Sequence, residues 1–187
     1  MDIRVLLVSH AATPPMRQGR FPSDEPLDAR GIADSEALCE RMTSIRDAVA
    51  LSSPAACARD TAQALGLAMR VVPELAEIDY GQWRGRRLAE LAESAPHELA
   101  AWSRDPDAAP HGGESFVQVL ARVGGWLDSF DEAASVVAIT HASVIRAALI
   151  HALNAPPASF THIEIAPLSV VEIRRSARGW AWWPALS

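Results

Sequence analysis

Residues 5–10 read Val-Leu-Leu-Val-Ser-His, and residues 136–141 read Val-Val-Ala-Ile-Thr-His. Both are short apolar runs rich in β-branched residues, a pattern typical of strands buried on both faces of a parallel sheet. Each run ends in a hydroxyl residue followed by a histidine. We therefore predict two matched strands whose carboxyl ends carry His10 and His141.

The rest of the chain alternates between helical and strand patterns around these two stretches. This alternation predicts an α/β fold: a three-layer α/β/α sandwich with a mostly parallel central sheet, and an edge strand or strands near the C-terminus. We expect one domain over residues 1–187. The predicted helices lie at 29–43, 55–65, 88–103 with a break near Pro96, 115–130 and 142–153, and the further strands at 48–51, 70–72, 161–165 and 169–174.

Composition and charge exclude several classes of function. The net charge of -6 offers no general attraction to nucleic acid or to an anionic membrane, and no apolar stretch has the length of a membrane span. All 17 basic residues are arginine, which excludes lysine chemistry. Cys39 and Cys57 are too few for a disulfide framework and their spacing fits no zinc motif, so we expect a reduced, cytoplasmic location.

The two strand-end histidines indicate phosphoryl transfer. Ligands of parallel sheets bind at the carboxyl ends of the strands, where both imidazoles would meet. One imidazole suits the role of a nucleophile that becomes phosphorylated, and a second, protonated one stabilises charge on the transferring group. A carboxylic acid would protonate the leaving oxygen, and Glu77 or Asp79, in the loop after the third strand, is placed to supply it.

Five segments, spread over nearly the whole chain, resemble the motifs of the histidine phosphatase superfamily, the phosphoglycerate mutase-like proteins. The resemblance implies a phosphomonoester hydrolase in which His10 is the nucleophile, Glu77 the proton donor and His141 the second pocket histidine. It implies no metal and no cofactor. The segments are Ser-His-Ala-Ala-Thr at 9–13, Pro-Leu-Asp-Ala-Arg-Gly at 26–31, the Ser-Ser-Pro start and Thr-Ala end of 52–62, Glu-Ile-Asp-Tyr-Gly-Gln-Trp-Arg-Gly at 77–85, and Gly-Gly-Glu-Ser at 112–115 with Thr-His-Ala-Ser-Val-Ile-Arg at 140–146.

The sequence departs from the family pattern at the phosphate clamp. The family has one arginine before the nucleophile, where this chain has Ser9, and one before the alanine of an Arg-Ala pair, where it has Cys57. The glycine after the nucleophile is Ala11. A guanidinium at the transferring group contributes about 10³ to 10⁵ in rate, so without replacement this chain should be a poor phosphatase.

Other side chains are candidates for completing the site. The candidates to replace the missing guanidiniums are Arg17, Arg20, Arg59 and Arg84, although a solvated surface position is the simpler interpretation of each. The expected substrate-binding positions are Ser9, Ala11, Thr13, Cys57 and Ala142.

Three functions remain open at the level of sequence. The first is hydrolysis of a small phosphorylated molecule, favoured over mutase action because the chain lacks the long insertions associated with the mutases. The second is a catalytically impaired protein that binds a ligand or anion and regulates, and the third is an enzyme acting on a less charged substrate. The aromatic tail at 180–184 would pack across the sheet edge or serve self-association, and a homodimer is a possible assembly.

Overall fold

The computed structural model describes residues 3–41, 48–131 and 134–184. A six-stranded sheet runs through its centre in the order β3-β2-β4-β1-β5-β6. The first four strands in this order pair in parallel, whereas β5 and β6 are antiparallel. The strands are β1 Ile3–Ser9, β2 Val49–Ser52, β3 Arg70–Val71, β4 Ala134–Thr140, β5 Val170–Ser176 and β6 Gly179–Trp183.

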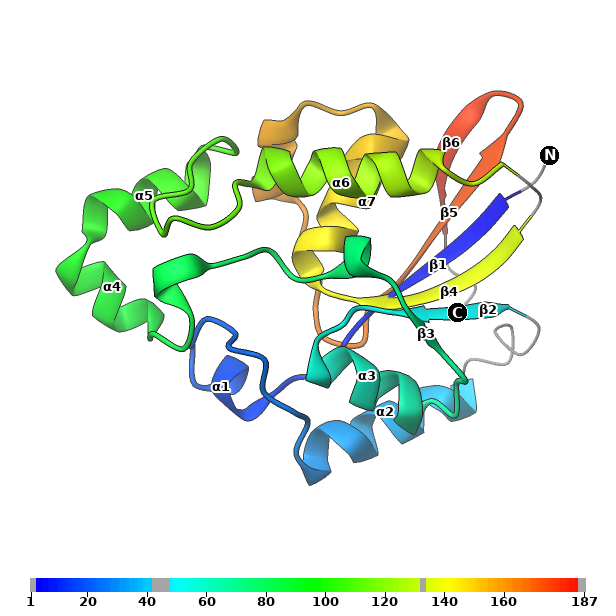
Figure 1. Cartoon of the computed structure of the whole chain (residues 1–187), viewed down its shortest axis with the longest axis horizontal. Coiled ribbons are helices and arrows are strands. Elements are labelled where there is room, and N and C mark those ends of the chain that lie inside the picture. The colour runs from blue at the N-terminus through cyan, green and yellow to red at the C-terminus, as the bar shows by residue number, and fades with distance from the viewer. Residues whose placement is uncertain (1–2, 42–47, 132–133, 185–187) are drawn as a thin grey trace.

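Helices cover both faces of the sheet, which confirms the predicted three-layer arrangement (Figure 1). Helices α6 and α7 lie on one face and α2 and α3 on the other, while α4 and α5 extend beyond the carboxyl ends of the parallel strands. None of the helices in the described part of the chain has the length and apolar character that a membrane span needs. The helices are α1 Pro14–Arg17, α2 Ala29–Arg41, α3 Ala56–Ala64, α4 Leu88–Ser94, α5 Pro96–Arg104, α6 Phe116–Asp128 and α7 Ala142–Leu153.

Strands β1 and β4 bring the two histidines to the same level of the sheet. They pair in parallel, with Ser9 opposite Thr140, and the backbone N–H of His10 donates to the Thr140 carbonyl at 2.9 Å. The strands are held in this register by side chains buried on both faces, as the apolar runs predicted. His10 and His141 therefore leave neighbouring strands side by side.

The C-terminal part of the chain differs from the prediction. The strand expected at 161–165 is wrong: residues 161 and 162 end a 3₁₀ helix that begins at Pro157, and residues 163–165 belong to no strand of the sheet. The strand expected at 169–174 is present as β5, but it lies between β1 and β6 rather than at the edge. The aromatic tail forms the edge strand β6.

Two smaller outcomes concern helix ends. The predicted break near Pro96 is confirmed, because α4 ends at Ser94 and Pro96 opens α5 at a position where its missing N–H costs nothing. Helix α1 forms inside a segment expected to be a loop, capped by the Thr13 hydroxyl. Residues 42 and 43 of the predicted helix 29–43 lie outside the described residues.

Candidate active site

The candidate site lies where β1, β2 and β4 end. His10 follows β1, Ser53 follows β2 and His141 follows β4, while Cys57 sits in the first turn of α3. Together with Glu77, these side chains line a cavity of about 520 Å³. The predicted catalytic residues His10, Glu77 and His141 are thus brought together, although they come from three separate segments.

His10 is buried and held in one tautomer. Its Nδ1 lies 2.8 Å from the carbonyl oxygen of Ala11, and because a carbonyl only accepts, Nδ1 carries the hydrogen. Nε2 is then left with a lone pair. Burial, and next the neighbouring His141, lower the pKa of His10 to about 4, so the ring is neutral at physiological pH.

His141 is buried between two polar partners. Its Nε2 shares a 2.7 Å hydrogen bond with the Ser53 hydroxyl. Its Nδ1 lies 3.3 Å from a carboxylate oxygen of Glu77, an ion-pair distance, but makes no well-aligned hydrogen bond to any described residue. His141 Nδ1 therefore faces the Glu77 carboxylate without an aligned hydrogen bond to it.

Glu77 is a buried carboxylate in a polar setting. Burial raises the pKa of Glu77. The charge on His141 and hydrogen bonds from the Ser143 hydroxyl and the Ile78 amide lower it by a larger amount, so the pKa is about 2. Glu77 is therefore ionised in the resting site. A role as proton donor requires a substrate that raises this pKa.

Arg122 fixes the segment that carries Glu77. Its guanidinium binds both carboxylate oxygens of Glu114, at 2.8 and 3.0 Å, and donates to the carbonyls of Glu74, Ala76 and Glu77 at 2.7, 3.0 and 3.4 Å. Arg122, Ser53 and Ser143 were all missed as site residues by sequence reasoning. Both serines lie within the quoted motifs, but nothing in the sequence marks Arg122.

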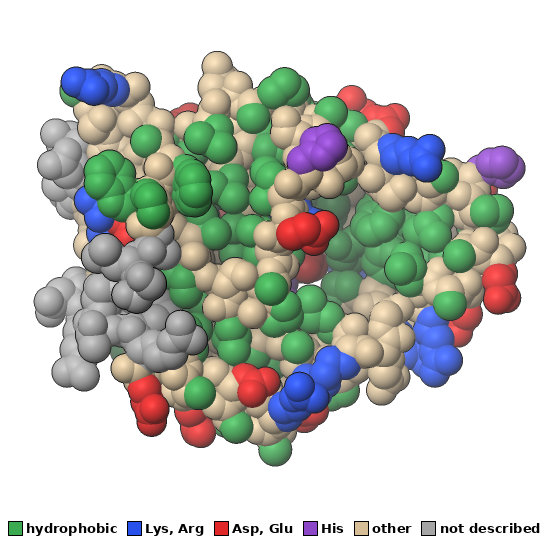
Figure 2. All heavy atoms as spheres, turned by 180° about the vertical axis from the view of Figure 1, so that it is seen from behind, with side chains coloured by type: hydrophobic (Ala, Val, Ile, Leu, Met, Phe, Trp, Pro, Cys, Tyr) green, Lys and Arg blue, Asp and Glu red, His purple; other side chains and the backbone are tan. Residues whose placement is uncertain are grey.

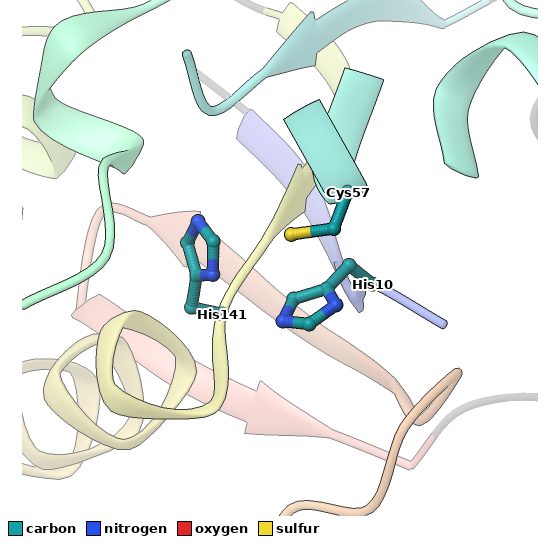
Figure 3. A group of neighbouring side chains, drawn as sticks. All are labelled: His10, Cys57 and His141. Atoms are coloured by element: carbon teal, nitrogen blue, oxygen red, sulfur yellow. The ribbon is translucent and has the colours of Figure 1, made fainter. Parts of the chain in front are cut away.

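Thr61 ties the nucleophile loop to α3. Its hydroxyl donates to the Cys57 carbonyl at 2.7 Å and accepts from the backbone N–H of Ala11 at 3.1 Å. Cys57 is buried, and its burial, with the charges of Glu77 and Glu25, raises the pKa of the thiol to about 12. The Cys57 side chain points toward the space between the rings of His10 and His141 (Figure 3).

The proposed compensating arginines are engaged elsewhere or lie outside the cavity. Arg17 donates to the Ala12 carbonyl and pairs with Asp28, and Arg59 is exposed on α3; neither is among the described residues that line the cavity. Arg84 and Arg20 line it, but Arg84 is 60% exposed and pairs with Asp79 at 3.0 Å, and Arg20 donates to the Gly85 carbonyl at 2.9 Å. These four guanidiniums are therefore bound to other groups or lie outside the cavity.

The expected substrate-binding positions divide in two. Thr13, Cys57 and Ala142 line the cavity. Ser9 and Ala11 are buried behind it, and the backbone of Ser9 is hydrogen-bonded to Leu168 and Ser169. These two positions shape the loop and are not among the described residues that face the cavity.

The outer part of the cavity is largely apolar. The Phe21 ring packs against Tyr80 and Trp102 with centroids 4.9 and 5.3 Å away, and all three line the cavity. Figure 2 shows hydrophobic side chains gathered around a hollow on the side of the molecule that carries α4 and α5, with charged side chains at its rim. The charged residues of the lining are Arg20, Arg84, Arg146, Asp24, Glu25 and Glu77.

Comparisons with known proteins place the whole chain in a family. The sequence profile of the histidine phosphatase superfamily (branch 1) matches residues 5–183. A bifunctional protein of Mycobacterium tuberculosis is 33% identical over 183 residues, covering 90% of this chain but 50% of the relative, so the chain spans about half the length of that relative. The adenosylcobalamin/alpha-ribazole phosphatase of Salmonella typhimurium is 27% identical over 173 residues, covering 87% of this chain and 86% of the relative.

Solved structures show the same architecture. The structure titled mycobacterial hydrolase 1 has a TM-score of 0.85 at 27% identity and covers 98% of both chains. A mycobacterial glucosyl-3-phosphoglycerate phosphatase in complex with VO3 has a TM-score of 0.84 at 28% identity and covers 96% of both chains.

Proposed function

The chain belongs to the histidine phosphatase superfamily, and on that premise we propose that it hydrolyses phosphomonoesters of a small metabolite through a phospho-His10 intermediate. The observation that carries the proposal is the tautomer of His10. Its Nδ1–H is tied to the Ala11 carbonyl, so the Nε2 lone pair of a neutral ring is available to attack phosphorus. Relatives named as phosphatases of small phosphorylated metabolites support the reaction class.

The proposed reaction has two steps. In the first, His10 Nε2 forms a bond to phosphorus, the bond to the leaving oxygen breaks, and that oxygen takes a proton. In the second, water attacks the phosphohistidine, the P–N bond breaks, and inorganic phosphate leaves. His141, protonated against Glu77 at 3.3 Å, would stabilise the transferring group in both steps.

The proton for the leaving oxygen is assigned to Glu77. The carboxylate is ionised in the resting site, with a pKa of about 2. A bound phosphate monoester places negative charge beside it, and a like charge raises the pKa of a carboxyl group. Substrate binding would therefore prepare Glu77 to take up the proton that it then donates.

The apolar outer cavity supports a substrate with a hydrophobic or aromatic leaving group. The rings of Phe21, Tyr80 and Trp102 offer area for stacking. The three arginines and three carboxylates among the lining residues balance, so the lining offers no net positive charge to a strongly anionic leaving group. An aryl or isoprenoid-like phosphate is a better match to this lining than a sugar bisphosphate.

A second candidate function is a ligand-binding or regulatory module without turnover. Ser9 and Cys57 favour it, because they stand where the quoted family motifs have arginine and no replacement guanidinium reaches His10 from Arg17, Arg59 or Arg84. The alternative of an enzyme on a less charged substrate rests on the same neutral pocket.

The test is phosphate release from a panel of phosphomonoesters, with a chelator present and across a range of pH. The panel pairs aryl and prenyl phosphates with sugar phosphates. We expect release by the wild type that is absent in His10→Ala, and faster release from the apolar substrates. If the wild type released phosphate no faster than His10→Ala from every substrate, hydrolysis would be rejected. The ligand-binding or regulatory module would then be the remaining candidate function.

A further inference from the structure

Three ligand-type side chains converge in the cavity. The ligand atoms of His10, Cys57 and His141 all lie within 4.8 Å of one another, and all three residues are buried. Figure 3 shows the two rings and the sulfur turned toward a common space between the end of β1, the start of α3 and the turn into α7. Two imidazoles and a thiol form a donor set that suits a thiophilic metal.

The hydrogen bonds leave one lone pair free on each ring. His10 Nδ1 is bound to the Ala11 carbonyl, which frees Nε2. When His141 Nε2 donates to the Ser53 hydroxyl, Nδ1 is a buried nitrogen with no hydrogen-bond partner among the described residues. Hydrogen bonding of the second ring nitrogen is the usual arrangement of metal-bound histidine.

We propose that His10 Nε2, Cys57 Sγ and His141 Nδ1 form a binding site for a thiophilic divalent transition metal, of which Zn²⁺ is the representative. In a tetrahedral zinc site, neighbouring ligand atoms are about 3.3 to 3.7 Å apart. Separations of up to 4.8 Å therefore close with side-chain movements of roughly 1 Å. Thiolate and imidazole donors exclude Mg²⁺ and Ca²⁺, which prefer oxygen.

The surrounding charge favours a cation. Glu77, Glu25 and Asp24 all act electrostatically on Cys57. On binding, the Cys57 S–H bond breaks and the sulfur bonds to the metal, while the proton of the thiol and that of a protonated His141 Nδ1 pass to solvent. One thiolate and two neutral rings then leave the centre with one positive charge. The Glu77 carboxylate, 3.3 Å from His141 Nδ1, is at the separation of adjacent ligands and balances that charge.

A bound metal and a phosphohistidine exclude each other. Both use the single lone pair of His10 Nε2, so the metal form would be inactive in the reaction proposed above. The metal site itself does not depend on that reaction, because it is detected by binding. Metal binding and phosphate release can therefore fail separately.

The experiment is titration of the reduced, metal-free chain with Co²⁺, followed by displacement with Zn²⁺ against a chromophoric chelator. We expect one equivalent of Co²⁺, a thiolate-to-cobalt charge-transfer band in the near ultraviolet, and the visible bands of a tetrahedral site. Loss of an outer hydrogen-bond partner weakens metal binding about 10- to 100-fold, so Cys57→Ala, which removes a ligand, should weaken it at least ~100-fold and abolish the charge-transfer band.

The chain supplies its own matched control. Cys39 is the other free cysteine; it is exposed, whereas Cys57 is buried. The variant Cys39→Ala should therefore retain the charge-transfer band and the affinity for Co²⁺. If Cys57→Ala does not fold, Cys57→Ser replaces it in the titration, because serine keeps the size and polarity of the side chain. Cys57→Ser should also lack the charge-transfer band. The proposal would be overturned if the wild type showed no charge-transfer band. It would also be overturned if Cys39→Ala lost the band while the folded Cys57 variants kept it.

Discussion

The imidazole rings of His10 and His141 meet edge to face with 4.9 Å between their centroids. In a buried site at this separation, two positive charges are unfavourable. Burial and the neighbouring His141 together hold the pKa of His10 at about 4, so His10 is neutral at physiological pH. This is the state in which its Nε2 can attack phosphorus or bind a metal.

The low pKa of His10 predicts that acid destabilises the metal-free protein. An unfolded chain titrates this ring near pH 6.5 and the folded one near 4, so between these values the unfolded state binds more protons and the free energy of unfolding falls as the pH falls. The full loss is about 3 kcal/mol. Urea unfolding at pH 7 and pH 4.5, with a chelator present, measures it.

The control for this prediction is a pair of glutamine variants. His10→Gln removes the buried ring and should lose about 2 to 3 kcal/mol less than the wild type over the same interval. His97→Gln changes an exposed histidine and should follow the wild type. The difference between the wild type and His10→Gln therefore measures the ring at position 10 together with its electrostatic coupling to Glu77, Glu25 and His141. Identical slopes for wild type and His10→Gln would contradict the assignment.

Ser143 is predicted to position and acidify Glu77. Its hydroxyl donates to the Glu77 carboxylate. A hydrogen bond to a charged group is worth about 1.5 to 3 kcal/mol, so Ser143→Ala should raise the pKa of Glu77. Because the carboxyl group also loses the contact that positions it, kcat should fall roughly 10- to 100-fold. A pH profile of kcat on the best substrate measures both: the alkaline limb, where Glu77 of the enzyme–substrate complex loses its proton, moves to higher pH while KM changes little.

Ser103→Ala is the matched control for Ser143→Ala. Ser103 is also a helical serine, but it is exposed and donates only to the Ala100 carbonyl. Its variant should retain the wild-type profile. A Ser143→Ala enzyme whose KM rises while the alkaline limb of the kcat profile stays in place would mean that Ser143 contributes to substrate binding and does not act on Glu77.

The strand ends were predictable because their signals are local. A doubly buried strand reads as an unbroken apolar run, and parallel pairing of two such runs brings the residues after them to one edge, so His10 and His141 follow from the sequence. The strand expected at 161–165 was wrong because alternation alone does not distinguish a strand from a 3₁₀ turn opened by Pro157.

The contacts across the site were not predictable from local patterns. The spacing of the two cysteines along the chain matches no zinc motif, so the sequence does not indicate a metal site at Cys57. In the structure, His10 and His141 approach Cys57 from two other elements. Arg122 meets Glu114 and three carbonyls only after α6 packs beside the loop of Glu77. Such long-range pairing depends on side-chain geometry, which no periodicity records.

Restoring a guanidinium at position 57 should raise phosphatase activity. Cys57 lines the cavity beside His10, and an arginine there would place a permanent positive charge near the transferring group. From the ~10³ to 10⁵ that a well-placed guanidinium contributes, we expect at least a 10-fold rise in kcat/KM for Cys57→Arg. Phosphate release with a chelator present measures it, and Ser9→Arg with Cys57→Arg tests the complete clamp.

Cys39→Arg separates a local effect from a change in net charge. It adds the same side chain at an exposed cysteine and should leave kcat/KM unchanged. Thermal unfolding checks that the larger side chain at the buried position 57 is tolerated. A folded Cys57→Arg no faster than the wild type would show that the missing guanidinium does not limit this site.

Arg122 should contribute far more to stability than an ordinary surface arginine. Its side chain is 22% exposed and binds Glu114 through two nitrogens, and it also satisfies backbone carbonyls of the Glu77 segment. Arg122→Ala leaves these acceptors unpaired, which should lower the free energy of unfolding by about 2 to 4 kcal/mol. Denaturant unfolding measures the loss, and faster amide exchange at residues 74–79 would locate it.

Arg30 provides the comparison that isolates the network. It lies on α2 with 73% of its side chain exposed and pairs only loosely with Asp34, at 3.9 Å. Exposed pairs of this kind contribute about 0.5 kcal/mol or less, so Arg30→Ala should be close to neutral. Equal losses for the two variants would mean that Arg122 acts as a solvated charge. In that case the position of Glu77, and with it the contact to His141, would have to be maintained by Ser143 and the backbone alone.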